Sequence, residues 1–211
     1  LFAKFIIMNS TTLYYIHDPM CSWCWGFEKI WRKIKKALPD DINIQYVLGG
    51  LAPDSNEIMP IKMHEYIQKN WRKIQTTIPN TKFNYDFWEK CQPKRSTYPA
   101  CRAVIATKNQ HSKLERKVIK LIQHAYYLHA QNPSEDSTLI QLANSLNLDI
   151  EKFTHDLNSK DTQQKLKDDI SLAHSLGVSS FPSLVLVTNG VNKHINIDYN
   201  NKNFVLKQIL A

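Results

Sequence analysis

The spacing of hydrophobic positions in the first part of the chain changes from strand-like to helix-like and back. A run rich in tyrosine, leucine and isoleucine from Thr12 to His17 predicts a strand. From Cys24 to Leu38, apolar residues recur at intervals of three and four with lysines and arginines opposite them, which predicts an amphipathic helix that Pro39 ends. Residues 42–48 alternate again and stop at Gly49-Gly50. Together these segments predict a βαβ unit with parallel strands.

Helix-like spacing dominates the middle of the chain, from Glu57 to Leu176, and Gly177 is expected to stop the last helix. Strand character returns in residues 184–188 and 193–198, which flank an expected turn at residues 189–192, and a final helix is expected over about 203–210. Two apolar stripes predict buried helix faces in the middle block: Leu114, Val118, Leu121, Ala125 and Leu128, and then Leu139, Leu142, Ala143 and Leu146.

The order of these elements predicts the fold class. A βαβ unit, a long helical block and a ββα unit indicate an α/β fold whose sheet is interrupted in sequence by helices. We expect residues 8–56 and 177–211 to form one domain and residues 57–176 to form an inserted helical subdomain. A chain of 211 residues is long enough for such a domain with an insertion.

Charge and hydropathy narrow the function classes. The net charge is +8, but the basic residues are scattered among acidic ones along the sequence, so we expect no nucleic-acid partner. Apolar runs are shorter than the ~20 residues of a spanning helix, so no membrane insertion is expected. Residues 1–7 do not resemble a secretion signal, and Met8 is either the natural start or part of a processed chain. The cytoplasm is the expected compartment, with the periplasm as the alternative.

The candidate reactive residues lie in one stretch, His17-Asp18-Pro19-Met20-Cys21-Ser22-Trp23-Cys24. Within it, Cys21 lies between the first predicted strand and the helix. The unpaired N–H groups of a helix N-terminus favour a thiolate, and cysteines placed there ionise near pH ~3.5–7.5 rather than ~8.5. Cys24 is one turn further on, where its sulfur can attack a mixed disulfide on Cys21. Trp23 and Trp25 are expected to shield the inner thiol and to offer apolar surface to a substrate.

Other interpretations of the cysteines are weaker. Zinc needs two further ligands at a comparable spacing, and neither Cys91 nor Cys101 supplies them, so we predict no metal site and no bound cofactor. A structural disulfide between Cys21 and Cys24 would close too small a loop to stabilise the fold much. Cys91 and Cys101 are expected to be reduced thiols, with a second redox pair as the alternative.

Three further residues are candidates for the site. His17 and Asp18 are candidate proton carriers for Cys24, or else ordinary strand-end and turn residues. Pro182 directly precedes a predicted strand, where a proline cannot donate to the ladder, and this makes the Phe181-Pro182 bond a candidate cis peptide.

At these motifs the sequence resembles the DsbA-like branch of the thioredoxin superfamily, especially its FrnE-type disulfide isomerases. The resemblance implies a thioredoxin-like fold, with Cys21 as the attacking thiol, Cys24 as the resolving thiol and Pro182 as a cis-proline facing them. It also implies that Phe181 offers its backbone to an extended substrate segment. Ser22, Trp23 and Trp25 are the other expected substrate-binding residues. The resemblance extends from about Leu13 to the C-terminus and rests on residues 18–26, Leu48-Gly49-Gly50-Leu51, residues 98–103 and residues 177–182.

The expected function is that of a thiol–disulfide oxidoreductase or isomerase acting on protein or peptide cysteines, with glutathione or a redox partner protein as candidate electron partners. Strongly oxidising relatives carry Pro-His between the cysteines, whereas this chain has Ser22-Trp23, so we expect a weaker oxidant and leave the direction of electron flow open. Two alternatives are a protein-binding adaptor whose cysteines are dispensable and a glutathione-dependent isomerase or transferase. Cys24 argues against the transferase, because such relatives generally lack the second cysteine.

Overall fold

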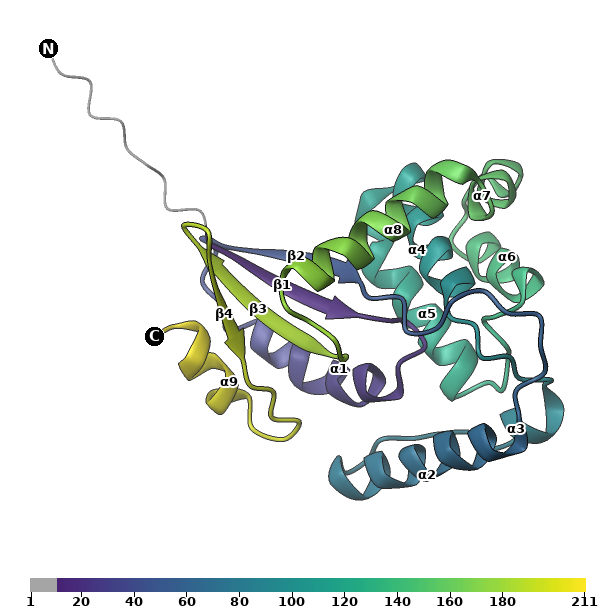
Figure 1. The fold of residues 1–211 in the computed structure, drawn as a ribbon, viewed down its shortest axis with the longest axis horizontal. Helices are drawn as coiled ribbons and strands as arrows, with labels where there is room; N and C mark the ends of the chain where they lie inside the picture. The colour runs from purple at the N-terminus through teal and green to yellow at the C-terminus, as the bar shows by residue number, and fades with distance from the viewer. Residues whose placement is uncertain (1–10) are drawn as a thin grey trace, which may run out of the picture.

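A four-stranded mixed sheet lies at one end of the molecule (Figure 1). The computed structural model describes residues 11–211, so the predictions about Met8 and residues 1–7 lie outside the described residues. The strand order is β2-β1-β3-β4, with β1 parallel to β2 and antiparallel to β3, and with β3 antiparallel to β4. The strands are β1 Thr11–His17, β2 Ile42–Leu48, β3 Ser183–Thr188 and β4 Val191–Ile195.

Helices cover both faces of this sheet (Figure 1). Helix α1 (Ser22–Lys35) and helix α9 (Lys202–Ile209) pack on one face, where Leu13 and Tyr15 of β1 meet a fully buried Trp31. Helix α8 (Lys160–Ser175) packs on the other face, against Ile16. Neighbouring residues of a strand point to opposite faces, so β1 contributes to both layers. This arrangement confirms the predicted α/β class and the parallel βαβ unit.

The segment between β2 and β3 is mostly helical, as predicted, and it forms most of a large apolar cluster that also includes Met20 and Leu48. The hydrophobic residues of α4, α5 and α7 meet there, with the fully buried Trp71 of α2 at its edge. The predicted domain boundaries near residues 56 and 177 fall outside helices and strands. The elements before α8 are α2 Ile61–Thr77, α3 Phe87–Lys90, α4 Tyr98–Gln110, the short 3₁₀ helix Ser112–Leu114, α5 Glu115–Tyr127, α6 Asp136–Asn144 and α7 Ile150–Leu157.

The predicted bounds of helix α1 and of strand β4 are wrong, and the causes are local. Helix α1 begins at Ser22 rather than Cys24, because the Cys21 sulfur accepts a hydrogen bond from the Cys24 N–H and caps the helix there. It ends at Lys35 rather than Leu38. Pro39 disfavours helical geometry at Leu38, the residue before it, and the chain leaves the helix in a turn over residues 36–38. Strand β4 begins at Val191 rather than Lys193, because Asn189 and Gly190 both have positive φ and close a two-residue hairpin turn.

The expected stop at Gly177 is confirmed. Gly177 has φ +74°, and the Val178 N–H donates to the Ala173 carbonyl at 3.0 Å, which closes the end of α8. Across residues 11–211, the helices are all too short or too polar to cross a membrane.

Candidate active site

Cys21 is the residue that caps helix α1. Its backbone is extended, with φ −79° and ψ 117°, and its N–H donates to the Asp18 carbonyl at 3.0 Å. Its sulfur accepts from the Cys24 N–H at 3.4 Å, so it lies among the free amides of the first helical turn. This is the placement that the sequence predicts, and it stabilises negative charge on the sulfur.

Cys24 lies one turn further on and differs from Cys21 in its access to solvent. Its side chain is completely buried, whereas Cys21 is 5% exposed and lines an open cavity. Burial raises the pKa of Cys24 well above its usual value, and the neighbouring Cys21 sulfur adds to the rise. Both cysteines are free thiols in this structure. The pair therefore consists of an accessible sulfur and an enclosed, protonated one.

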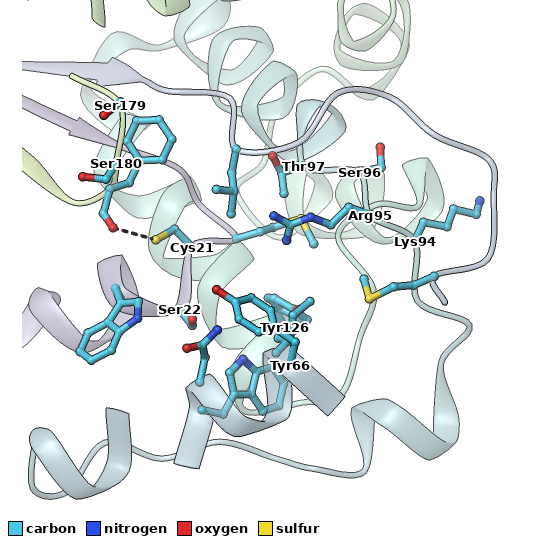
Figure 2. A pocket seen from close by; sticks show the side chains of 18 residues that line it. Cys21, Ser22, Tyr66, Lys94, Arg95, Ser96, Thr97, Tyr126, Ser179 and Ser180 are labelled. Carbon is cyan, nitrogen blue, oxygen red and sulfur yellow. Dashed lines mark hydrogen bonds between the residues drawn. The ribbon is translucent and has the colours of Figure 1, made fainter. Parts of the chain in front are cut away.

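A cavity of about 290 Å³ opens beside Cys21, and Figure 2 shows the residues around it. Ser22 and Trp23 form its wall on α1, and α2 and the loop before α4 close the opposite side. Arg95 points into the cavity in Figure 2, whereas Lys94 points away from Cys21 and pairs with Glu135 at 2.9 Å. The lining residues are Met20, Cys21, Ser22, Trp23, Leu51, Met59, Tyr66, Ile67, Asn70, Trp71, Lys94, Arg95, Ser96, Thr97, Tyr126, Ser179, Ser180 and Phe181.

Phe181 faces Cys21 across this cavity. The Cys21 thiol donates to the Phe181 carbonyl at 3.5 Å, and the Phe181-Pro182 peptide bond is cis. The ring of Phe181 packs so closely on Gly49 that a Cβ there would lie 2.1 Å from it. Only glycine permits that approach, so the Gly49 at the end of β2 helps to place Phe181. The substrate-binding roles of Phe181 and Pro182 stay predictions.

Asp18 is fully buried behind Cys21 and is surrounded by hydrogen-bond donors. One carboxylate oxygen accepts from the Met20 N–H at 2.8 Å, and the other accepts from the Leu51 N–H and the Thr97 hydroxyl, each at 2.7 Å. The Cys101 thiol donates to the second oxygen at 3.5 Å. Burial raises the pKa of Asp18 in spite of these donors, which lower it.

His17 precedes Asp18 but lies in a different environment. Its ring stacks on Tyr15 at 5.2 Å between centroids and meets Tyr46 edge-on at 5.9 Å. Burial, followed by the charges of Arg116 and Lys108, lowers the pKa of His17 to about 3. Its Nε2 is buried and has no hydrogen-bond partner among residues 11–211, so the neutral ring sits in an aromatic cluster.

The two tryptophans around Cys24 point to different places. Trp23 lines the Cys21 cavity and packs on Tyr199, with centroids 5.1 Å apart. Trp25 stacks on Tyr127 at 5.6 Å and donates its indole N–H to the Lys82 carbonyl at 3.0 Å. Trp25 therefore belongs to a different surface of α1, and nothing at the Cys21 cavity supports its predicted contact with substrate.

The sequence did not point to Arg95 or Thr97, and it suggested for Cys101 a reduced thiol, or a second redox pair with Cys91, rather than a contact with Asp18. Cys101 is buried and free, as expected, and it also contacts Asp18. Cys91 is a free, half-buried thiol that donates to the Ala130 carbonyl at 3.0 Å. Among residues 11–211, histidines, cysteines and carboxylates form no group that could hold a metal ion.

Comparisons with known proteins agree with this geometry. A family model described as thioredoxin matches residues 14–208. The structure of a candidate protein disulfide isomerase from Nitrosomonas europaea is 25% identical, with a TM-score of 0.81 and 96% of both chains covered. The cytosolic disulfide reductase DsbM from Pseudomonas aeruginosa is 20% identical, with a TM-score of 0.71 and 93% of both chains covered, and it has also been solved with GSH.

A curated relative has a different description. The ClpXP adapter protein SpxH from Halalkalibacterium halodurans is 25% identical over 185 residues, which are 86% of this chain and 60% of that protein. The chain thus spans about 60% of the length of this relative. Because the family model covers nearly the whole described chain, the protein belongs to the thioredoxin family, with a fold that DsbA-type oxidoreductases share.

Proposed function

We propose that this protein is a thiol–disulfide oxidoreductase and isomerase that acts on protein or peptide cysteines through Cys21 and Cys24. The observation that carries the proposal is the difference between the two sulfurs. Cys21 caps α1 at the wall of an open cavity, and Cys24 is buried one turn behind it. An accessible nucleophile backed by an enclosed thiol suits a two-step exchange.

The proposed exchange has two steps. The Cys21 thiolate attacks one sulfur of a substrate disulfide, forms a mixed disulfide and releases the other substrate sulfur as a thiolate. Cys24 then loses its proton and attacks the Cys21 sulfur, which forms the Cys21–Cys24 disulfide and releases the second substrate sulfur. The substrate gains two electrons and the protein loses two. In isomerisation, another substrate thiolate attacks the mixed disulfide before Cys24 does.

Asp18 is suited to take the proton that Cys24 must lose. The charge of Asp18 is among the causes that raise the pKa of Cys24, after burial and the Cys21 sulfur, because both groups are negative when ionised. Transfer of the proton from Cys24 to Asp18 therefore avoids two negative charges side by side. The raised pKa of Asp18 makes this carboxylate a better proton acceptor than an ordinary one.

The rim of the cavity favours protein substrates. Leu51 and Tyr66 line the cavity and are 36% and 59% exposed. Exposed apolar groups gathered around a reactive sulfur are suited to bind the apolar segments of a protein chain. The Phe181 carbonyl can accept a backbone N–H from the same segment.

Insulin reduction with glutathione as the reductant tests the proposal. We expect Cys21→Ser to abolish turnover and Cys24→Ser to accumulate a mixed disulfide that a non-reducing gel detects. Cys91→Ser serves as a matched control, because Cys91 is a free thiol that does not line the cavity. Turnover that survives in Cys21→Ser would reject the assignment.

Glutathione is the best-supported candidate for the electron donor that reduces the Cys21–Cys24 disulfide. DsbM, which shares the fold, has been solved with GSH. Here Arg95 points into the cavity, and a guanidinium binds carboxylates such as those of glutathione. We expect Arg95→Gln to raise the KM for glutathione about tenfold with little change in kcat. In the cytoplasm, the compartment we propose, glutathione or a redox partner protein would restore the two thiols.

A second candidate function is that of an adaptor, which the SpxH relatives favour. In that case the double variant Cys21→Ser/Cys24→Ser should bind the ClpX ATPase as tightly as the wild type in a pull-down with purified proteins. Insulin turnover that depends on Cys21, without ClpX binding, would favour the enzyme. Glutathione-dependent transferase activity stays a prediction. Glutathione conjugation that survives in Cys24→Ala would support it.

A further inference from the structure

A second cavity, of about 580 Å³, lies on another surface of α1. Trp25, Lys29 and Arg32 line it from α1, where side chains three and four residues apart share one face. Residues 78–82 after α2 form a second wall, and α5 forms the third. None of its lining residues belongs to the Cys21 cavity. This space is therefore separate from the redox site.

The cavity concentrates positive charge that is dispersed in the sequence. Six lysine or arginine side chains line it, but only one carboxylate, that of Glu28. Glu28 is already paired with Arg116, whose guanidinium nitrogen lies 2.9 and 2.8 Å from its two oxygens. The other cations form no ion pair with any carboxylate of residues 11–211, and they are Lys29, Arg32, Lys82, Lys117 and Lys120.

Such an arrangement is costly for the protein alone. Like charges around one hollow repel each other, and low-dielectric walls focus their field. All five of these cations are exposed, so packing of the core does not require them there. An anion of matching size would remove the repulsion.

One cation is fixed in place, which a binding site needs. Arg116 is held by Glu28 and lies over the Tyr46 ring, 4.7 Å from its centroid. The lysines around it are exposed, and their long side chains can turn toward a ligand. A fixed guanidinium among mobile ammonium groups suits a ligand with several negative groups.

Part of the cavity lining is apolar, and close packing holds these apolar side chains in position. Trp25 is held between Tyr127 and the edge of His124. Gly26 lets the chain around Ile78 approach α1, because a Cβ at residue 26 would lie 2.6 Å from Ile78 Cδ1. Leu128 adds to this lining. An apolar wall beside cations suits an organic molecule rather than a bare inorganic ion.

We propose that this second cavity binds a small organic polyanion that carries two or more phosphate or carboxylate groups. The volume is within the range of small-molecule sites, ~300–1,000 Å³, and three separate elements enclose it. A small molecule fits these walls better than an extended acidic chain does. The site is distinct from the exchange reaction at Cys21 and does not depend on it.

Isothermal titration of the full chain with ATP, citrate and tripolyphosphate tests the inference, and comparing them distinguishes phosphate from carboxylate ligands. The site variant is Lys117→Glu/Lys120→Glu, two exposed lysines of α5 that line the cavity. The control is Lys69→Glu/Lys73→Glu, which makes the same charge change at two exposed lysines of α2 that line neither cavity. Lys117→Gln/Lys120→Gln provides a milder variant, and circular dichroism checks the folding of all of them.

We expect at least one of the organic polyanions to bind with one-to-one stoichiometry and more tightly than tripolyphosphate. The affinity should fall at least tenfold in Lys117→Glu/Lys120→Glu and less in the glutamine variant, and stay within twofold in the α2 control. Equal losses in both glutamate variants would show a general charge effect and overturn the proposal. Absence of binding at millimolar concentration would overturn it, as would binding of hexaglutamate or of a short oligonucleotide without binding of the small anions.

Discussion

His17 and Asp18, two adjacent ionisable residues at the end of β1, have side chains in two very different environments. His17 lies in an aromatic cluster with Tyr15 and Tyr46, where its Nε2 has no hydrogen-bond partner within the described part of the chain. Asp18 enters a polar junction, where two backbone N–H groups, the Thr97 hydroxyl and the Cys101 thiol point at its carboxylate. Both residues are buried, with exposed fractions of 1% and 0%.

Burial therefore does not tell the two residues apart, but their partners do. Desolvation favours the neutral form of each, which lowers the pKa of His17 and raises that of Asp18. The donors around Asp18 stabilise its charged form and oppose the rise of its pKa. The aromatic rings around His17 offer no comparable help to an imidazolium. Of the two proton carriers that the sequence suggested, Asp18 is the one we propose for Cys24.

The largest effect is expected from Asp18→Leu. This change leaves the N–H groups of Met20 and Leu51 buried without their acceptor, which should lower the free energy of unfolding by about 3–5 kcal/mol. Urea titration followed by tryptophan fluorescence measures the loss. A loss below about 1 kcal/mol would mean that the polar junction contributes little to the fold.

Asp18→Asn separates the chemical role from this structural one. It keeps an acceptor oxygen and the shape but cannot take a proton, so we expect Cys24 to release the mixed disulfide about a hundredfold more slowly. Rapid mixing of a Cys21-linked reporter peptide measures that step. In the wild type the rate should rise with pH as Asp18 ionises through its raised pKa, and in the variant this rise should be absent. A wild-type pH profile in Asp18→Asn would assign the proton to another group.

Those features of the fold and the site that depend on residues adjacent in sequence could be predicted from the sequence. The strand ending at His17, the helix after Cys21 and the stop at Gly177 all follow from local spacing and backbone preference. The accessible Cys21 and the enclosed Cys24 follow from the same helix geometry. A spacing of three residues is nearly one helical turn wherever the helix packs.

The partners of Asp18 could not be predicted in this way. Thr97 and Cys101 are about eighty residues further along the chain and reach Asp18 only because α4 packs at the end of the sheet. The direction of Trp25 also depends on a distant element, since Tyr127 of α5 stacks on it. Cations spread along the sequence likewise surround one cavity only after α1 and α5 come together. Long-range contacts of this kind leave no local pattern.

Thr97→Val should have an intermediate effect. Valine has nearly the shape of threonine, but Asp18 loses a donor and the Ala52 N–H loses the acceptor that now lies at 3.0 Å. We expect a loss of about 2 kcal/mol in the free energy of unfolding. Because one donor to the carboxylate disappears, the pKa of Asp18 should rise further, and the pH profile of mixed-disulfide release should move to higher pH. An unchanged profile would mean that Thr97 only supports the fold.

Cys101→Ala should have a smaller effect. The thiol of Cys101 is a weak donor at 3.5 Å, so its removal should cost about 1 kcal/mol, mainly in lost packing. Insulin turnover should stay within about threefold of the wild type, since RT ln 3 is about 0.6 kcal/mol. Cys91→Ala is the matched control, because Cys91 is a free thiol bonded to Ala130 rather than to Asp18. A complete loss of turnover in Cys101→Ala alone would instead indicate a second redox thiol.

His17→Phe should have the smallest effect at pH 7 and the clearest dependence on pH. Phenylalanine keeps the stacking on Tyr15 and removes a buried nitrogen without a partner, so turnover should be unchanged and stability equal or slightly higher. Below pH ~6.5 the unfolded wild type takes up a proton at His17, which the folded protein resists until its pKa of about 3. The wild type should therefore lose stability relative to His17→Phe as the pH falls, by up to about 3 kcal/mol at pH 4. Asp18 has the opposite dependence, because its raised pKa stabilises the folded state in acid, but it is present in both proteins and cancels from their difference. Urea titrations of the two proteins at several pH values measure that difference, and a gap that does not widen with acid would mean that His17 becomes charged inside the folded protein.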